Sequence, residues 1–356
     1  MNIDKGLTLK GLFTSEEILG AVIDRLEAEQ QDNIIWKNFL SFRPTRSRAW
    51  TVKYGAETGV SVGSVIDRNA KKPLRSRKPV GSGYLEVMNM GDRWQLDNDN
   101  LEDLAHLIKD FNQAQPSDRG VYIDRIVDII IRDYKEAYLA PHKRMDLMVG
   151  QFLSTGQSIV DRKNNPKGVE LKDLKLPVKR FTAKAEDQEK FMEYILTLVK
   201  KENLQAEVMM MNRHTFSKIA STSKEFQNTY KALMGTAEFT VNAGLISEDM
   251  ANQVFSALGL PRLIIMEEYV TVNDERVNIF EDDRIALLPS LNLGDMRHYK
   301  TLESDDHVPN YVYQDLEGDH LIGSLRDENG RMVEYTAAWL PEFFNPTQHA
   351  VIKLGK

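Results

Sequence analysis

The sequence predicts an α+β protein in which helices and antiparallel hairpins are mixed along the chain. Two observations point to this class. Apolar residues recur three or four positions apart over a long stretch that begins at Asp118, which is the period of a helix buried on one side. Elsewhere, short β-branched runs are separated by turn residues, as in "YVTVNDERVNIF", where Asn273 and Asp274 predict a hairpin turn.

The N-terminal part predicts a helix followed by a long extended excursion. Thr14 and Glu17 fit a capping box in front of an apolar stripe. Six glycines between residues 50 and 94 argue against a long helix there. We therefore expect two extended arms, at about 50–67 and 80–90, with a basic tip between them.

The stretch from Asp118 to Leu153 predicts the longest helix of the chain. Its apolar positions follow the helical period: Ile123, Ile126, Val127, Ile130, Tyr134, Ala137 and Tyr138. Pro141 should bend or restart this helix, because proline has no amide hydrogen to donate. A single straight helix of this length would span about 54 Å, which suits a scaffold more than a compact enzyme core.

The remainder of the chain predicts alternating short helices and strands. In order, we expect a hairpin at 157–177 through "RKNNPKG", a helix at 186–201, a strand at 207–211, a helix from Asn212, a helix at 247–258 and a closing strand "HAVIKL".

The composition excludes several classes of site. The 356 residues include no cysteine, so disulfides, zinc–thiolate sites and thiol nucleophiles are excluded, and a reducing cytosol is expected. The first twenty residues contain no apolar run of signal-peptide length, and no segment approaches 18 consecutive apolar residues. We therefore expect no membrane association.

The charge is unevenly distributed around a net value of -7. Residues 41–93 contain 11 Lys and Arg against 4 Asp and Glu, a net charge of +7, and residues 266–335 contain 6 against 17, a net charge of -11. Segments of opposite sign can attract one another, within one subunit or between copies.

Signatures of catalysis are missing from the sequence. The seven histidines do not form an HExxH or HxxxH pair, and the phosphate-binding, dinucleotide-binding and GxSxG signatures are absent. "SDDH" and "GDH", which end at His307 and His320, are typical of solvated loops more than of metal sites. "DNDNLED" lacks the glycine and glutamate of a calcium loop, so Asp97 or Asp99 is expected to cap a helix. We expect no catalytic, cofactor-binding or metal-binding residue.

The basic tip is the candidate functional site. Its five basic residues are Lys71, Lys72, Arg75, Arg77 and Lys78. They could belong to a solvated loop, contact nucleic acid or contact protein. The segment contains no aromatic residue for base stacking, and the whole chain is acidic, which disfavours nucleic acid. A two-stranded ribbon is marginally stable in water, so we expect it to become ordered on another surface, such as the acidic C-terminal segment.

This order of elements resembles the major capsid proteins of tailed bacteriophages, in particular the lambda-type branch. "GVSVGSVIDRNAKKPLRSRKPV" and "LEVMNMGDRWQLDNDNLEDLA" are similar to the extended loop of that family and to the exit from it. "VDIIIRDYKEAYLAPHKRMDLMVGQFLSTGQSIV" resembles its spine helix and the hairpin that follows. "LQAEVMMMNRHTFSKIASTSKEFQ" resembles its axial domain, and "VNIFEDDRIALLPSLNLGDMRHY" and "FFNPTQHAVIKL" resemble its closing strands.

The resemblance implies the tailed-phage major capsid fold, divided into four parts. These are an N-terminal arm at 1–45, an extended ribbon loop at 46–95, a peripheral domain with the spine helix at 96–180 and 330–356, and an axial domain with a β-hairpin at 181–329. The N-terminal arm matches no part of the family pattern that we can place.

The expected function is that of a structural subunit, with no enzymatic activity and no cofactor. The resemblance implies self-assembly in hexamers and pentamers into an icosahedral phage head, in the virion and after assembly in the host bacterial cytoplasm. The head would enclose DNA without binding a specific sequence, and scaffolding, decoration and portal proteins are the further partners. Two alternatives stay open: a related shell that encloses protein cargo, and a carboxylate-dependent hydrolase that uses the acidic region after Met266.

Overall fold

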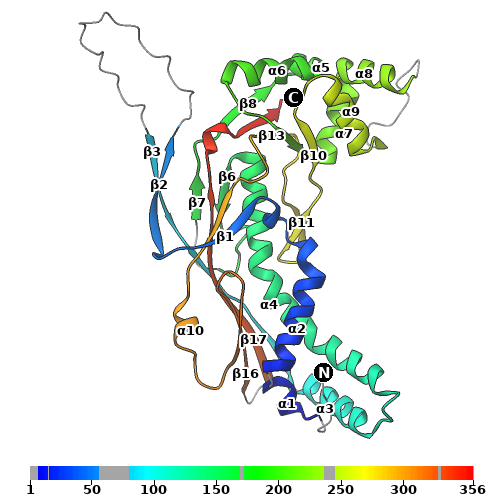
Figure 1. Ribbon diagram of the computed structural model, residues 1–356, viewed down its shortest axis with the longest axis vertical. Helices are drawn as coiled ribbons and strands as arrows, with labels where there is room; N and C mark the ends of the chain where they lie inside the picture. Colours follow the sequence, from blue (N-terminus) through cyan, green and yellow to red (C-terminus); the bar gives the residue numbers. More distant parts are fainter. Residues whose placement is uncertain are drawn as a thin grey trace, which may run out of the picture. The chain divides into compact units, whose positions relative to one another are not determined.

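The computed structural model of the chain describes residues 7–14, 16–55, 80–168, 172–235, 245–327 and 330–355. The chain forms two compact units. Unit 1 comprises residues 1–49, 86–146 and 295–342, and unit 2 comprises residues 50–85, 147–294 and 343–356. Both units combine helices with sheets, which confirms the α+β class (Figure 1). The four-part division expected from the sequence is not tested by these units and stays a prediction.

Unit 1 is built on a seven-stranded sheet. Its strand order is β1-β14-β17-β16-β15, and β4 and β5 also pair with β17. The strands are β1 (Leu40–Pro44), β4 (Met88–Met90), β5 (Arg93–Asp97), β14 (Gly294–His298), β15 (Val312–Leu316), β16 (His320–Asp327) and β17 (Gly330–Phe343). The strand β17 organises the sheet because β16, β5 and β4 all pair with it in antiparallel register.

Helical elements accompany this sheet in unit 1, and most of them bury apolar residues. They are α1 (Leu9–Thr14), α2 (Glu16–Gln30), η1 (Gln31–Asn33), η2 (Trp36–Asn38), α3 (Asn98–Gln113), α10 (Leu302–Asp305) and the first part of α4 (Arg119–Thr155). Leu19, Ile23 and Leu26 of α2 are almost fully buried. The predicted N-terminal helix is therefore confirmed, whereas its capping box lies outside the side chains that the structure describes.

The predicted long helix is confirmed as α4, whose 37 residues make it the longest helix in the described part of the chain. Ile126, Ile130 and Tyr134, three of the positions that predicted it, are at most 5% exposed. The helix does not restart at Pro141, which lies inside it.

Unit 2 contains a five-stranded mixed sheet in the order β10-β9-β13-β18-β8. The strands are β8 (Lys179–Ala183), β9 (Val208–Met211), β10 (Arg262–Ile265), β13 (Arg284–Leu288) and β18 (Ala350–Leu354). The residues of β9 are all buried, and so are Ile285 to Leu288 of β13. Both faces of the central strands are therefore covered, which explains why these runs are apolar without alternation.

Five helices cover one face of this sheet: α5 (Ala185–Glu189), α6 (Phe191–Glu202), α7 (Arg213–Thr222), α8 (Lys224–Met234) and α9 (Glu248–Ala257). Phe191, Phe216 and Phe255 from three of them share one core with Met209 and Leu287 of the sheet. The predicted helix at 186–201 is divided into α5 and α6, with Lys190 between them in a non-helical conformation.

Three sheets of two strands complete the described structure: β2 (Ala49–Gly55) with β3 (Val80–Glu86), β6 (Gln157–Val160) with β7 (Lys172–Lys175), and β11 (Tyr269–Val272) with β12 (Glu275–Asn278). The turn between β11 and β12 places Asn273 and Asp274 at φ values of 53° and 66°, which a tight hairpin turn requires. The last short element is η4 (Pro346–Gln348). No helix of the described residues is both long and apolar enough to cross a membrane.

Candidate functional site

The five basic residues of the predicted tip, Lys71, Lys72, Arg75, Arg77 and Lys78, lie outside the described residues, as does the expected ordering of that segment. The structure describes the two strands that lead to it. In β3, Leu85 is buried, whereas the ring of Tyr84 is 70% exposed. In a single copy of the chain, the ribbon therefore leaves a large aromatic side chain exposed to solvent.

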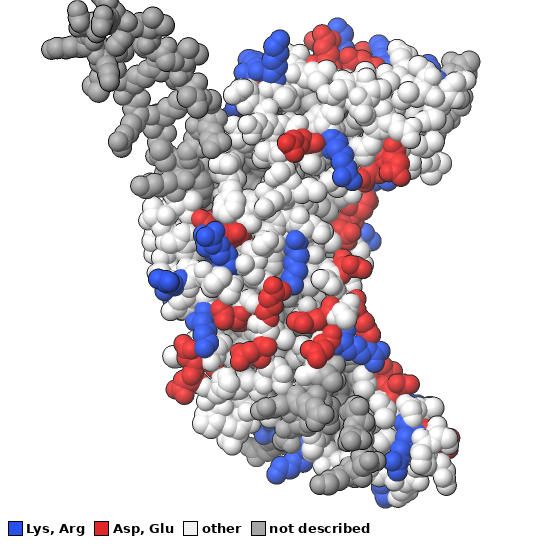
Figure 2. Space-filling view, in the orientation of Figure 1, with Lys and Arg blue, Asp and Glu red and all other residues white. Residues whose placement is uncertain are grey.

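Part of the acidic segment 266–335 is engaged in pairs within the subunit. In unit 1, Asp295 pairs with Arg43 at 3.0 Å, and Glu334 accepts a hydrogen bond from Arg93 at 2.7 Å. Further pairs are Lys37–Glu317, Lys300–Asp305 and His298–Asp319. Figure 2 likewise shows acidic and basic side chains next to one another on the face drawn there. Much of the negative charge is therefore compensated locally.

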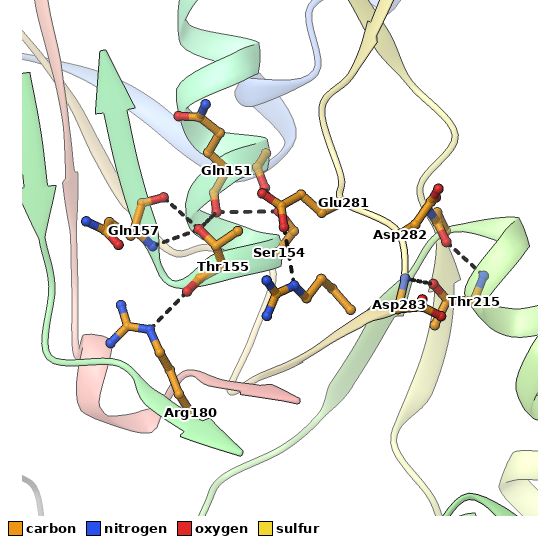
Figure 3. A network of polar contacts seen from close by, with 12 residues as sticks. Gln151, Ser154, Thr155, Gln157, Arg180, Thr215, Glu281, Asp282 and Asp283 are labelled. Atoms are coloured by element: carbon orange, nitrogen blue, oxygen red, sulfur yellow. Dashed lines mark hydrogen bonds and ion pairs between the residues drawn. The ribbon is translucent and has the colours of Figure 1, made fainter. Parts of the chain in front are cut away.

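In unit 2, two successive acidic residues, Asp282 and Asp283, hold the start of β13 against α7 (Figure 3). Asp282 accepts a hydrogen bond from Asn212, the N-cap residue of α7. The backbone amide of Asp283 donates to Thr215 Oγ1 at 2.9 Å, and its carboxylate pairs with Lys218 at 2.8 Å. Glu281 pairs with Arg284 at 3.3 Å. These contacts give the acidic run a structural task in fixing a strand to a helix.

A small polar pocket lies beside this run and is the place where a carboxylate-dependent reaction would be sought. Its volume is about 80 Å³, and Glu267, Glu268, His214 and Asp282 line it. Glu267 already accepts a hydrogen bond from the backbone amide of Arg213. Among the described residues no group of three or more His, Cys, Asp or Glu side chains could hold a metal ion. Residues just before β11 and at the end of β12 also line the pocket, so it lies at the base of the β11–β12 hairpin.

The C-terminal end of α4 is fixed by side chains that satisfy its last carbonyl groups (Figure 3). The Arg180 guanidinium donates to the Thr155 carbonyl at 3.1 Å and to the Gly156 carbonyl at 3.0 Å. Thr155 Oγ1 donates to the Gln151 carbonyl at 2.7 Å. A cation at a helix C-terminus also interacts favourably with the helix dipole. These bonds anchor the long helix to β8, the strand that carries Arg180.

Unit 1 contains a buried histidine cluster beside Pro141. Proline has no amide hydrogen, so the carbonyl of Ala137, four residues earlier in α4, lacks its helical donor. His320 of β16 is buried beside this part of the helix, and its ring stacks on that of Tyr138 with the centroids 6.2 Å apart. The helix nevertheless continues through Pro141.

His142 lies next to His320, with the two ring centroids 6.0 Å apart. The indole Nε1–H of Trp36 donates to His142 Nδ1 at 3.2 Å, so this nitrogen carries no proton and the ring is neutral. Burial lowers the pKa of His142 well below its usual value, and burial lowers the pKa of His320 to about 3. Both rings act as packed, uncharged members of the core.

Asp146, one turn after His142, is the carboxylate of this cluster. It accepts hydrogen bonds from the Trp36 backbone amide at 2.8 Å and from Lys143 Nζ at 3.1 Å. Burial raises the pKa of Asp146 to about 6, and the charge of Lys143 opposes this shift. The carboxylate thus ties η2 to α4 in the interior of unit 1.

Sequence reasoning treated the histidines as scattered and missed this cluster. No local sequence signal indicates the cluster, because Trp36, His142 and His320 lie far apart in the chain. The N-cap expectation was correct: Asp97 accepts a hydrogen bond from the amide of Asn100 at 2.9 Å. Neither His307, which stacks on Tyr313, nor the buried His320 belongs to a possible metal-binding group of the described residues.

Comparison with known proteins gives similarities at the level of solved structures. No protein-family model and no curated protein sequence matches the chain. A prophage protein of Escherichia coli CFT073 that is assigned as a capsid protein is 12% identical, with a TM-score of 0.49 over 78% of this chain and 80% of its own. The satellite phage P4 procapsid is 10% identical, with a TM-score of 0.42 over 94% and 100%. The virus-like particle of Pyrococcus furiosus is 10% identical, with a TM-score of 0.40 over 93% and 98%.

Proposed function

We propose that this chain is a major capsid subunit of the tailed-phage type, which assembles with copies of itself into an icosahedral shell around DNA. The subunit is structural and catalyses no reaction. Hexamers and pentamers of the chain form the shell, and scaffolding, decoration and portal proteins join it during assembly in the bacterial cytoplasm. The packaged DNA is enclosed without recognition of its sequence.

The observation that carries this proposal is the ribbon of β2 and β3. These strands pair with each other and with no other described strand. A two-stranded sheet is marginally stable in water unless another surface covers it. The exposed ring of Tyr84 on β3 gives such a surface a large apolar area to bury. A second copy of the chain supplies that surface in a shell.

The order of the described elements supports the same proposal. The ribbon is followed by α3, by the long helix α4, by the β6–β7 hairpin and by the five-stranded sheet with its helices. This is the order in which the sequence resembles the capsid family. The hydrolase alternative is weakened, because Glu281, Asp282 and Asp283 are engaged in contacts between β13 and its surroundings.

Sedimentation of the purified chain, followed by electron microscopy, tests the proposal. A shell subunit gives closed particles of megadalton mass or curved oligomers under some condition of salt and protein concentration. A small oligomer of constant size under all conditions would overturn the proposal. Nuclease-resistant DNA inside particles from the natural source distinguishes a virion from a shell that holds protein cargo.

The tip residues Lys71, Lys72, Arg75, Arg77 and Lys78 are proposed to contact a neighbouring subunit. Reversal of two of them in the variant Arg75→Glu/Arg77→Glu is expected to leave the subunit folded, because it replaces one charged side chain by another and removes no apolar side chain. Assembly then fails or becomes sensitive to salt, since exposed charges are screened over about 8 Å at physiological ionic strength.

The matched control is Lys200→Glu/Lys201→Glu, which reverses two exposed charges in the last turn of α6. We expect this control to assemble normally. Normal particles from the tip variant that had lost only their DNA would show that the tip serves nucleic acid instead of a neighbouring subunit.

A further inference from the structure

The helices α3 and α4 of unit 1 form the walls of an open groove. They follow one another in the chain and are joined by residues 114–118 (Figure 1). The groove has a volume of about 510 Å³. Leu107 of α3 and Ile129 of α4 contribute apolar surface to it, and both are only partly buried. The groove can therefore bury an apolar side chain that comes from outside the subunit.

Acidic residues flank this apolar surface. Asp103 and Asp110 of α3 and Asp128 of α4 line the groove, together with one basic residue, Arg125. With His106 counted as neutral, the lining carries three negative charges against one positive charge. Asp128 also interacts electrostatically with Arg25.

The two aspartates of α3 are the uncompensated charges of the groove. Both are exposed, and neither makes a hydrogen bond through its side chain or an ion pair with another residue that the structure describes. They differ in this from the acidic residues at 295–334, many of which are already paired. An incoming basic segment would therefore find free acceptors at Asp103 and Asp110.

We propose that this groove receives the basic segment 71–78 of a second copy of the chain. The segment reads "KKPLRSRK" and holds one leucine, Leu74, between five basic residues. Leu74 matches the apolar surface at Leu107 and Ile129, and the flanking cations match the aspartates. The inference rests on the proposed function, and it identifies the surface that the tip contacts.

The segment is assigned to a second copy because the ribbon that leads to it needs another surface. The strands β2 and β3 pair with each other and with no other described strand, and a two-stranded sheet is marginally stable in water by itself. Copies of the chain lie side by side in a shell, so a neighbouring copy offers its groove to the segment.

Binding of a labelled peptide to the full-length chain tests the inference without requiring shell formation. The probe is the synthetic segment 68–83, and fluorescence anisotropy measures its affinity at about 50 mM salt, where surface charges are weakly screened. We expect saturable binding to the parent chain. The variant Asp103→Lys/Asp110→Lys should bind the peptide at least tenfold more weakly.

The matched control Glu102→Lys/Glu136→Lys makes the same change of net charge at two exposed positions on the same helices, outside the groove. It should bind the peptide within threefold of the parent. Circular dichroism shows whether Asp103→Lys/Asp110→Lys folds. If it does not fold, the variant Asp103→Asn/Asp110→Asn is used instead, because it removes both negative charges without adding positive ones. It should still weaken peptide binding severalfold.

A charge exchange completes the test. A peptide that carries Arg75→Glu and Arg77→Glu should bind poorly to the parent and regain affinity for Asp103→Lys/Asp110→Lys. No binding to the parent, or equal binding to groove and control variants, would overturn the inference. If particles form but the peptide does not bind the groove, this contact is rejected and the proposed function stands. If the peptide binds the groove but no particles form under any condition, the contact stands and the proposed function is rejected.

Discussion

Acidification should destabilise this protein because three histidines are held neutral in its interior. Burial lowers the pKa of His320 and of His349 to about 3, and it lowers the pKa of His142 well below the usual value. In the unfolded chain each of these rings titrates near 6.5. Unfolding therefore takes up protons below pH 6.5. The stability is fully present above that pH and is lost progressively as the pH falls toward 3.

The size of the effect follows from the pKa values. Each buried histidine costs about 1.4 kcal/mol of stability for each pH unit below 6.5. At pH 5, His320 and His349 together cost about 4 kcal/mol, and His142 adds to this. Asp146 acts in the opposite direction. Its carboxylate binds a proton below about pH 6 in the folded state but only at lower pH in the unfolded state. Protonation of Asp146 therefore stabilises the folded state by about 1 kcal/mol at pH 5. The net loss is a large part of a typical stability of about 5–15 kcal/mol.

Urea unfolding of the unassembled chain between pH 8 and pH 5, followed by circular dichroism, measures this loss. The informative variant is His349→Leu, which removes one buried titrating ring that packs on Phe152 at a centroid distance of 4.7 Å. The free energy of unfolding of this variant should gain about 2 kcal/mol relative to the parent between pH 7 and pH 5. The control variant is Ile352→Val, a buried change in β18 that removes no titratable group, so its difference from the parent should stay constant. A parent stability that is flat down to pH 5, or a constant difference for His349→Leu, would refute the reasoning.

Three further substitutions test how the elements are held. Ile130→Asp places a charge at a site that is 5% exposed in the middle of α4, so we expect insoluble or unfolded protein, and recovery of soluble chain with the normal helix content by circular dichroism would contradict the packing. Gly150→Val should destabilise unit 2 by several kcal/mol, because even a Cβ atom at this position would lie 2.8 Å from the carbonyl carbon of Ile279. A thermal unfolding midpoint equal to that of the parent would contradict this close packing. Asp97→Ala removes the N-cap bond to the Asn100 amide and should cost about 1 kcal/mol in urea unfolding, whereas Asp97→Asn should cost less.

Local features of this protein follow from the sequence because neighbouring residues determine them. The helical period from Ile123 to Tyr138 predicted α4, and the turn residues Asn273 and Asp274 predicted the β11–β12 hairpin. The N-cap of α3 was predicted at Asp97 or Asp99 from the stretch "DNDNLED", and Asp97 is the residue that caps the helix. Each of these features depends on the backbone geometry of one or two turns. The residues that determine that geometry are close together in the sequence, so a short stretch is enough to predict it.

Contacts between distant residues were decided only by the tertiary structure. The buried cluster around His142 depends on Trp36 and His320, which lie 106 and 178 positions away in the chain. The excess of negative charge at 266–335 suggested a free acidic surface, yet Arg43 and Lys37 from the N-terminal part pair with two of its carboxylates. The charge of a segment is a sum over its residues, but its availability depends on which partners the packing brings within hydrogen-bonding distance. Composition therefore predicted the opposite charges, and the fold decided which carboxylates already have a partner within the subunit.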